Sequence, residues 1–298
     1  MNIIDPDLPG RARLGSVFHP SDFSRASEIA FAHALRIALA TQAGLNILHV
    51  DADYDADWAD FPGVRSTLER WGRLAAGSPA SAVADLGIDV SKVIRSNDDP
   101  VKASLDFLAT HPSDLIVLAV HQYEGRTRWL KERVGEPIAR GAEEMTLFVP
   151  YGVQGFVSPD GAVSLRNILI PVAKEPRATP AMEAAALMVR ALDLPSGTFH
   201  LLHVGRTVDA PSLRFENPPE GWTVQRLTVE GEPSEVILRK AGDLGADMIV
   251  MTTEGPHGFL DALRGSTSER VLRKTPCPVM SLPANAWSSR MRRFWTTQ

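Results

Sequence analysis

The sequence predicts an α/β protein with two tandem domains of one fold, each built on a parallel sheet with helices on both faces. Short apolar runs alternate with helical patterns along the chain, which implies right-handed crossovers between parallel strands. The second half also repeats the first, because the tetrapeptide DLIV at 114–117 recurs as DMIV at 247–250. A chain of 298 residues is long enough to bury two such cores.

The first half contains five strand patterns separated by helix patterns. The strands are short apolar runs of the kind buried in parallel sheets, and the helices carry apolar residues three or four apart. Asp99-Pro100 marks a helix start, since proline is tolerated in a first turn. We expect strands at 14–18, 45–50, 90–94, 115–120 and 147–150, and helices at 27–40, through Leu68, Trp71 and Leu74, from Asp99-Pro100 and around Ile138.

A segment with a different pattern separates the two halves. Its sequence SPDG at 158–161 is typical of a tight turn, and FV at 156–157 and AV at 162–163 form the arms of a hairpin. This segment is therefore interpreted as a linker. The chain is divided into a first domain at 1–150, a hairpin linker at 151–166, a second domain at 167–285 and a basic aromatic tail at 286–298.

The second half follows the same order of elements. Strands are expected at 168–172, 201–204 and 248–251, and a final strand follows the sequence PCP at 276–278. From the third strand onwards the halves align at one offset of 133 residues without a gap, so that Asp114 corresponds to Asp247. The second copy is shorter between its second and third strands, and the helix at 68–74 has no counterpart there.

Composition excludes several classes of function. The net charge of −5 argues against nucleic acid as a partner, because neutralising phosphates requires a basic surface. No apolar run approaches the length of a membrane span, and the first residues lack the basic start and apolar core of a signal peptide. The single cysteine excludes an internal disulfide and predicts a reducing, cytoplasmic setting, with Cys277 as a small buried residue.

The stretch 247–283 carries the most informative pattern. A buried strand is followed by a loop with Gly255 and Gly258, and the tripeptide GST at 265–267 then opens a helix. The first amides of a helix have no internal partner and lie at the positive end of the helix dipole, so this start suits a phosphate. The same residues also fit an ordinary helix cap, and glycine spacing alone does not separate the two interpretations.

This stretch resembles the nucleotide motif of the universal stress proteins, G-x2-G-x9-G-[S/T], which precedes a helix and a final PCPV strand. Gly255, nine residues and then Gly265-Ser266 match its second and third glycines and its hydroxyl, and PCPV stands at 276–279. Thr252 replaces the first glycine of the motif.

The resemblance covers nearly the whole chain. It implies two Rossmann-like domains, each a five-stranded parallel sheet of order 3-2-1-4-5. It also implies that they pack as an intramolecular pseudo-dimer through their last strands, around 147–149 and 279–282, with a further homodimer as an option.

The two halves differ in the motif. At the fixed offset, Glu-Arg at 132–133 replaces Gly-Ser at 265–266, so no phosphate cradle is expected in the first half. Asp22 resembles the family aspartate that contacts the nucleoside, but it fits equally well as an acid at a helix N-terminus. Its counterpart in the second half is Ala173, followed by Lys174, which is either a solvated charge or a phosphate contact.

Parallel sheets bind ligands at the carboxyl ends of their strands, where the strand order reverses. The resemblance therefore implies that an adenine nucleotide, ATP with Mg²⁺ only as its companion, binds there in the second domain. Two valines would cover the adenine face, the ordinary apolar part of a small-molecule site. The residues expected to line it are Pro171, Val172, Val204, Thr252, Gly255, Gly258, Gly265, Ser266 and Thr267.

No pattern in the chain predicts an enzyme. The HEXXH, paired CxxC, GxSxG and P-loop lysine motifs are absent, and no nucleophile is evident beside a base. His49 and His203 end corresponding strands, which favours a role in the fold. The aspartates of 51–60 favour a solvated loop over a cation site.

These observations lead to a cytoplasmic stress-response protein that binds ATP or a related adenine nucleotide in its second domain, for regulation and with at most slow incidental hydrolysis. One alternative is a stress-response scaffold that binds no nucleotide and acts through protein partners, which Thr252 and Ala173 favour. Another is a crevice adapted to a different small molecule. We expect docking of the basic aromatic tail onto the protein rather than onto a membrane.

Overall fold

A computed structural model describes residues 14–52, 57–120, 135–253 and 267–284. The strands of the first half are β1 Ser16–Pro20, β2 Gly44–Asp51, β3 Val90–Ser96, β4 Leu115–Val120 and β5 Met145–Pro150. Its helices are α1 Arg25–Thr41, α2 Val64–Arg70, α3 Pro100–Thr110 and α4 Gly135–Ala142, with 3-10 turns η1 Trp58–Asp60 and η2 Ala80–Leu86.

The second half repeats this order with a shorter connection before its third strand. Its strands are β6 Asn167–Val172, β7 Gly197–Val204, β8 Trp222–Val229, β9 Met248–Thr253 and β10 Val279–Pro283. Its helices are α5 Thr179–Ala191, α6 Pro233–Asp243 and α8 Thr267–Lys274, with the 3-10 turn η3 Thr207–Asp209. Only η3 is described between β7 and β8, so the missing counterpart of α2 is confirmed for the described residues.

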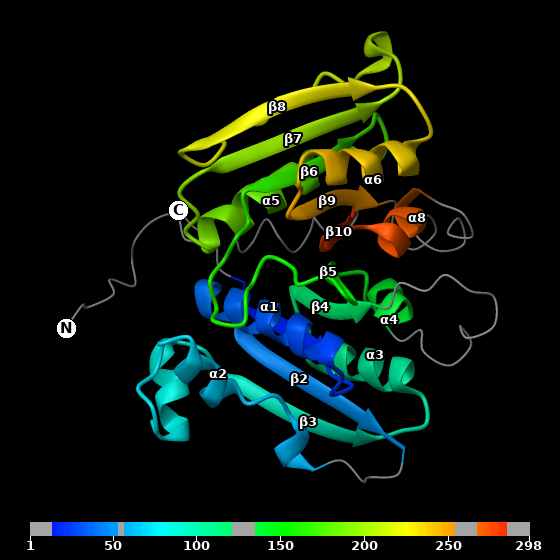
Figure 1. Ribbon diagram of the computed structural model, residues 1–298. Helices are drawn as coiled ribbons and strands as arrows, with labels where there is room; N and C mark the ends of the chain where they lie inside the picture. Colours follow the sequence, from blue (N-terminus) through cyan, green and yellow to red (C-terminus); the bar gives the residue numbers. More distant parts are fainter. Residues whose placement is uncertain (1–13, 53–56, 121–134, 254–266, 285–298) are drawn as a thin grey trace.

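The ten strands that the structure describes lie in one sheet of order β3-β2-β1-β4-β5-β10-β9-β6-β7-β8 (Figure 1). Within each half the strands are parallel, as the alternation of strands and helices predicted. The halves join through β5 and β10, which run antiparallel with Leu147 opposite Met280. The α/β fold of two tandem Rossmann-like units is therefore confirmed, and so is the predicted meeting of their last strands.

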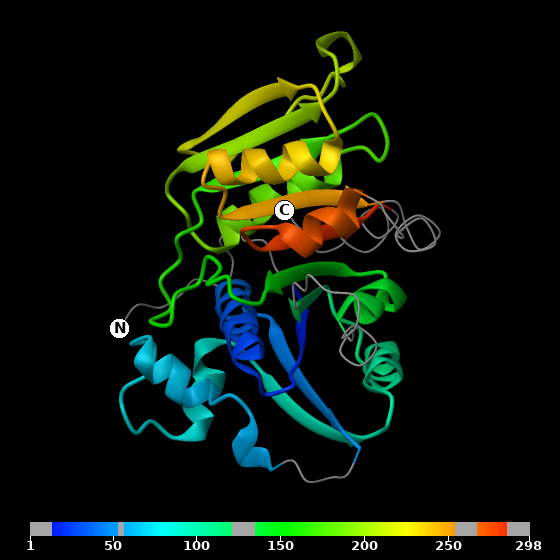
Figure 2. The ribbon, with the colours of Figure 1, turned by 45° about the vertical axis from the view of Figure 1, so that its right-hand side comes forward.

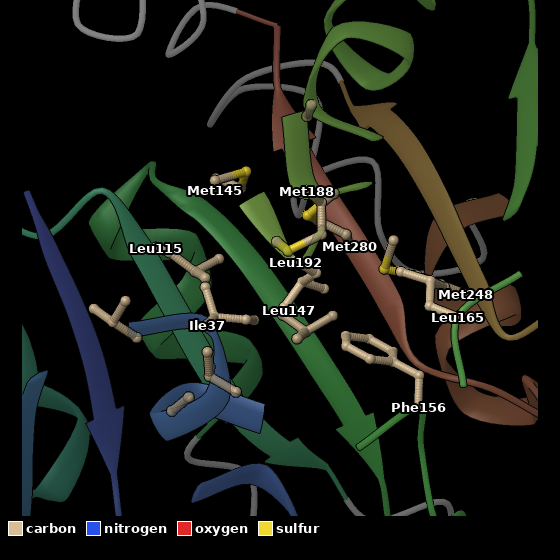
Figure 3. Close-up of a cluster of buried hydrophobic side chains, with 14 of the residues drawn as sticks. Ile37, Leu115, Met145, Leu147, Phe156, Leu165, Met188, Leu192, Met248 and Met280 are labelled. Atoms are coloured by element: carbon tan, nitrogen blue, oxygen red, sulfur yellow. The ribbon is translucent and has the colours of Figure 1, made fainter. Parts of the chain in front are cut away.

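The helices cover the two faces of this sheet in two groups (Figure 2). Apolar residues of α1, α2 and α5 pack in one buried cluster, and those of α3, α4, α6 and α8 pack in the other. The first cluster is continuous across the joint between the halves. Figure 3 shows Ile37 of α1 and Leu147 of β5 close to Met188 of α5 and Met280 of β10, all of them buried.

An aspartate directly before the fourth strand of each half, β4 and β9, explains part of the sequence repeat. The Asp114 carboxylate accepts main-chain N–H bonds from Gly15 at 2.6 Å and Ser16 at 3.2 Å. Asp247 accepts the same pair of bonds from Arg166 and Asn167, at 2.7 and 2.8 Å. Because these N–H groups would otherwise lack a partner, the carboxylate fixes where β1 and β6 begin.

The register of the edge strands corrects one prediction. Leu45 of β2 and Phe199 of β7 are equivalent, since each lies beside the second residue of its central strand. Their partners on the outer side are Val90 and Val224, which differ by 134 residues. The expected offset of 133 without a gap is therefore wrong by one residue at β3 and β8, and it holds at Asp114 and Asp247.

The helix expected through Trp71 and Leu74 is also shorter than predicted. It ends at Arg70, and Gly72 follows with a φ of +65°, a conformation that favours glycine and stops the helix. The indole N–H of Trp71 instead donates to the Pro159 carbonyl at 3.1 Å. The apolar spacing was therefore misread, because Trp71 packs under the linker hairpin and does not extend the helix.

The linker is a small hairpin that α1 holds in place. Val157 and Val163 form an antiparallel bridge, which confirms the hairpin. His33 Nε2 accepts main-chain N–H bonds from Phe156 at 3.0 Å and Val157 at 3.2 Å, and its Nδ1–H donates to the Ile29 carbonyl at 2.8 Å. All three bonds require the neutral ring with its proton on Nδ1.

Candidate functional site

A cavity of about 470 Å³ lies at the carboxyl ends of β6, β7 and β9. β6 has β7 on one side and β9 on the other, so the cavity lies where the strand order of the second half reverses. The loop 173–176 that follows β6, Asp209 of η3, the first turn of α8 and two residues of α6, Pro233 and Ile237, also line it.

Every predicted site residue that the structure describes lines this cavity. These residues are Pro171, Val172, Val204, Thr252 and Thr267, and they come from β6, β7, β9 and α8. The other four predicted residues, Gly255, Gly258, Gly265 and Ser266, lie outside the described residues. The structure thus brings together four separate segments, while the glycine loop itself stays a prediction.

Two polar atoms of residues that line the cavity are buried without a hydrogen-bond partner among the described residues. One is Oγ1 of Thr252, whose residue is 9% exposed, and the other is Nε2 of His203. A buried polar group without a partner costs about 1–3 kcal/mol of folding free energy. The simplest explanation for such a group is a ligand or an ordered water that supplies the missing hydrogen bond.

The charged residues at the rim differ in whether they have partners. The Asp209 carboxylate pairs with Arg206 at 2.9 Å, and the Glu175 carboxylate lies 3.9 Å from the Arg177 guanidinium. Lys174 is exposed and has no ion pair within the described part of the chain. The rim therefore offers one ammonium group that an anionic ligand can reach.

The first turn of α8 is fixed to α6 by an ion pair. The Arg270 guanidinium donates to Glu232 Oε1 at 3.0 Å, and the other oxygen of Glu232 accepts from Ser234 Oγ at 2.6 Å and from the Glu235 N–H at 2.9 Å. The bond from Ser234 is the main reason that the pKa of Glu232 is lowered. Thr267, the first residue of α8, is thereby held at the cavity, where helix amides favour an anion.

At the corresponding edge of the first domain, an aromatic side chain of the protein stacks on the histidine near the end of β2. Phe23, in the loop after β1, packs against His49 of β2 and against Phe61, which is buried. Asp22 is exposed, and its Oδ1 accepts the Ser24 N–H at 3.0 Å, so it stabilises the turn before α1. The residues at 132–133 lie outside the described part of the chain.

Sequence reasoning missed part of the lining. His203 was assigned a role in the fold, and its Nδ1–H does donate to the Val172 carbonyl at 3.3 Å, but the residue also lines the cavity. Pro233 and Ile237 of α6 were not predicted. The sequence feature that could have indicated them is the helix start at Glu232-Pro233. It begins α6, which contributes both residues to the cavity.

Other candidate residues have structural roles. Cys277 is buried, as predicted, and burial raises the pKa of its thiol to about 12. Asp57 and Asp60 of the acidic segment cap η1, with the Asp60 carboxylate accepting the Asp57 N–H at 2.9 Å. Within the described ranges, no group of three metal-binding side chains occurs and no helix is long and apolar enough to cross a membrane.

Comparison with known proteins identifies the family. The profile of the Universal stress protein family matches residues 16–150 and 213–283, more than half of the chain. The chain belongs to the universal stress protein family. Among curated members, a universal stress protein of Methanocaldococcus jannaschii is 37% identical over 69 residues, covering 23% of this chain and 43% of that protein. One of Synechocystis is 25% identical over 144 residues, covering 42% of this chain and 90% of that protein.

Solved structures support the tandem fold. A universal stress protein from Archaeoglobus fulgidus aligns with a TM-score of 0.61 at 20% identity, covering 90% of this chain and 98% of that chain. This likeness concerns the fold alone. For three curated relatives the matched segment spans only 37–43% of the relative's own length, so the activities of whole relatives transfer to this chain only as proposals.

Proposed function

We propose that this universal stress protein binds an adenine nucleotide, with ATP as the first candidate, in the cavity of its second domain. Binding regulates conformation or choice of partner, and hydrolysis is at most slow and incidental. The phosphates lie at the start of α8 beside Thr267, and the base lies toward Val172 and Val204. The single cysteine of the chain is buried, which fits the proposed cytoplasmic location.

The observation that carries this proposal is the convergence of four chain segments on one cavity, two of whose lining residues have a buried polar atom without a partner among the described residues. Thr252 replaces the glycine of the family motif, yet its Oγ1 belongs to a residue that lines the cavity and has no partner among the described residues. A cavity of about 470 Å³ is in the range of small-molecule sites, which are mostly apolar with a few polar groups. The apolar lining and the exposed Lys174 suit a flat base attached to an anion.

The alternative is a scaffold that binds no nucleotide. It is favoured by Ala173, which stands where the first domain has Asp22, because the second domain thereby lacks a carboxylate at the end of its central strand. This alternative predicts that ATP leaves the stability of the protein unchanged. Thermal unfolding distinguishes the two proposals directly.

ATP with Mg²⁺ is expected to raise the melting temperature of the full chain. At one hundred times its dissociation constant, a ligand that binds only the folded state adds about 2.7 kcal/mol of stability. The variant Thr267→Glu should lose this shift, because a carboxylate at the first position of α8 repels phosphate. The same carboxylate interacts favourably with the helix dipole, so the variant keeps its own fold.

A matched control is Thr179→Glu, which places the same charge on the exposed first residue of α5, away from the cavity lining. We expect this variant to keep the full ATP shift. A wild-type protein without any shift at millimolar ATP would reject nucleotide binding. A shift that survives Thr267→Glu would reject the placement of the phosphates at α8.

A further inference from the structure

The first domain shows which kind of group fits beside its crevice histidine. The ring of Phe23 stacks on the ring of His49, with 3.9 Å between centroids and 18° between planes. Phe61 meets Phe23 edge to face at 5.2 Å, and Trp58 stacks on Phe61 at 5.7 Å. A planar aromatic ring therefore occupies the end of β2, held from a second side by another ring.

His203 holds the equivalent place in the second domain. His49 donates from Nδ1–H to the Ser21 carbonyl at 2.7 Å, and His203 donates from Nδ1–H to the Val172 carbonyl at 3.3 Å. Both carbonyls belong to the residues where the central strand of each domain gives way to the loop before the next helix. The two imidazole rings are therefore tied to the crevice by the same bond.

The residues that follow the two carbonyls differ between His49 and His203. Phe23 lies two residues after Ser21, and the residue two positions after Val172 is Lys174, which is exposed and lines the cavity. No aromatic contact of His203 occurs among the described residues, whereas His49 contacts both Phe23 and Phe61. In the second domain, Lys174, at the position equivalent to Phe23, and His203 both line the cavity.

We propose that His203 is the stacking platform for a planar ring of the ligand, so that Phe23 occupies in the first domain the place that the base takes in the second. This inference rests on the proposed function and adds to it the group that recognises the base. It assigns specificity for ring-bearing ligands to His203 and leaves the anion to α8 and Lys174. Stacked aromatic pairs strengthen an interaction beyond simple burial.

The test compares a ligand that has a ring with one that lacks it. In the full chain, His203→Ala is expected to weaken ATP binding roughly threefold to tenfold, measured by titration calorimetry. Binding of inorganic tripolyphosphate should stay unchanged, because it has no ring to stack. His203→Phe keeps an aromatic ring and should bind ATP within about twofold of the wild type. The control His49→Ala, in the first domain where Phe23 stacks on this ring, should leave the affinity for both ligands unchanged.

The outcomes separate this inference from the function on which it rests. Equal weakening of ATP and tripolyphosphate in His203→Ala would show that the ring only supports the fold, and would overturn the inference. ATP affinity that is unchanged in His203→Ala would also overturn it, while the proposed function stands. A wild-type protein that binds no ATP would overturn both. If His203→Ala does not fold, the ATP affinities of His203→Leu and His203→Phe are compared instead. The leucine variant, which lacks an aromatic ring, is expected to bind ATP more weakly than the phenylalanine variant.

Discussion

Acid is expected to destabilise this protein well before its carboxylates are neutralised, because two histidines are buried in the neutral form. Burial lowers the pKa of both His19 and His33 from 6.5 to about 4. In His19 burial outweighs the Val117 hydrogen bond and the charge of Asp22, which act in the opposite direction. In His33 burial likewise outweighs the bond to Ile29. Protonation of His33 at Nε2 would remove the two hydrogen bonds that this nitrogen accepts from main-chain N–H groups.

The direction of the effect follows from the two pKa values. Between about pH 6.5 and pH 4 the unfolded chain binds protons that the folded chain does not, so the free energy of unfolding falls as the pH falls. Over this window each histidine lowers the free energy of unfolding by roughly 3 kcal/mol. Urea unfolding at a series of pH values measures the loss.

The second domain supplies the control for this prediction. His19 is the fourth residue of β1, and the fourth residue of β6 is Ile170. The variant His19→Ile therefore has a natural precedent in the same molecule, and it should remove the contribution of His19 to the pH dependence. A stability profile that is flat between pH 6.5 and 4.5, or that is the same in the variant, would contradict this account.

Phe156→Ala is expected to destabilise the protein by about 3–5 kcal/mol, the range for removing a buried aromatic side chain. Phe156 is 1% exposed, and its ring meets His33 edge to face at 4.6 Å. Figure 3 places it beside Leu147 and Leu165 at the joint between the halves. The neighbouring strands are fixed by the ten-stranded sheet and cannot collapse into the cavity that the variant leaves.

Urea unfolding at pH 7.5 measures this loss, with Trp58→Ala as a control for removing an aromatic side chain. Trp58 is 60% exposed, so its truncation should change the free energy of unfolding by about 0.5 kcal/mol or less. A loss below about 1 kcal/mol for Phe156→Ala would mean that the linker hairpin does not pack as described.

The sequence predicts the repeated elements of this fold well, because short apolar runs and helix caps act locally. Asp99 and Glu232 each accept the N–H of the residue three positions later, as helix starts require. Trp71 was misassigned to a helix because its apolar side chain contacts the linker, 88 residues away in the chain, and such contacts leave no trace in local spacing.

The candidate site was predicted in part for the same reason. The ends of β6, β7 and β9 can be located from the sequence, and a parallel sheet brings them to one edge. The proposed role of His203 could not be predicted, since both histidines stand between a leucine and a valine in the sequence. In the structure, Phe23 stacks on His49, and no aromatic ring stacks on His203 among the described residues.

Titration calorimetry of the full chain with ATP and Mg²⁺ tests the central claim most directly, because it counts sites. Phe23 stacks on the crevice histidine of the first domain, whereas the second domain has a cavity of about 470 Å³, so we expect one site per chain, abolished by Thr267→Glu. Two sites per chain would contradict the proposal that only the second domain binds the nucleotide. The lack of any binding at millimolar ATP would contradict the proposed nucleotide site and favour the scaffold.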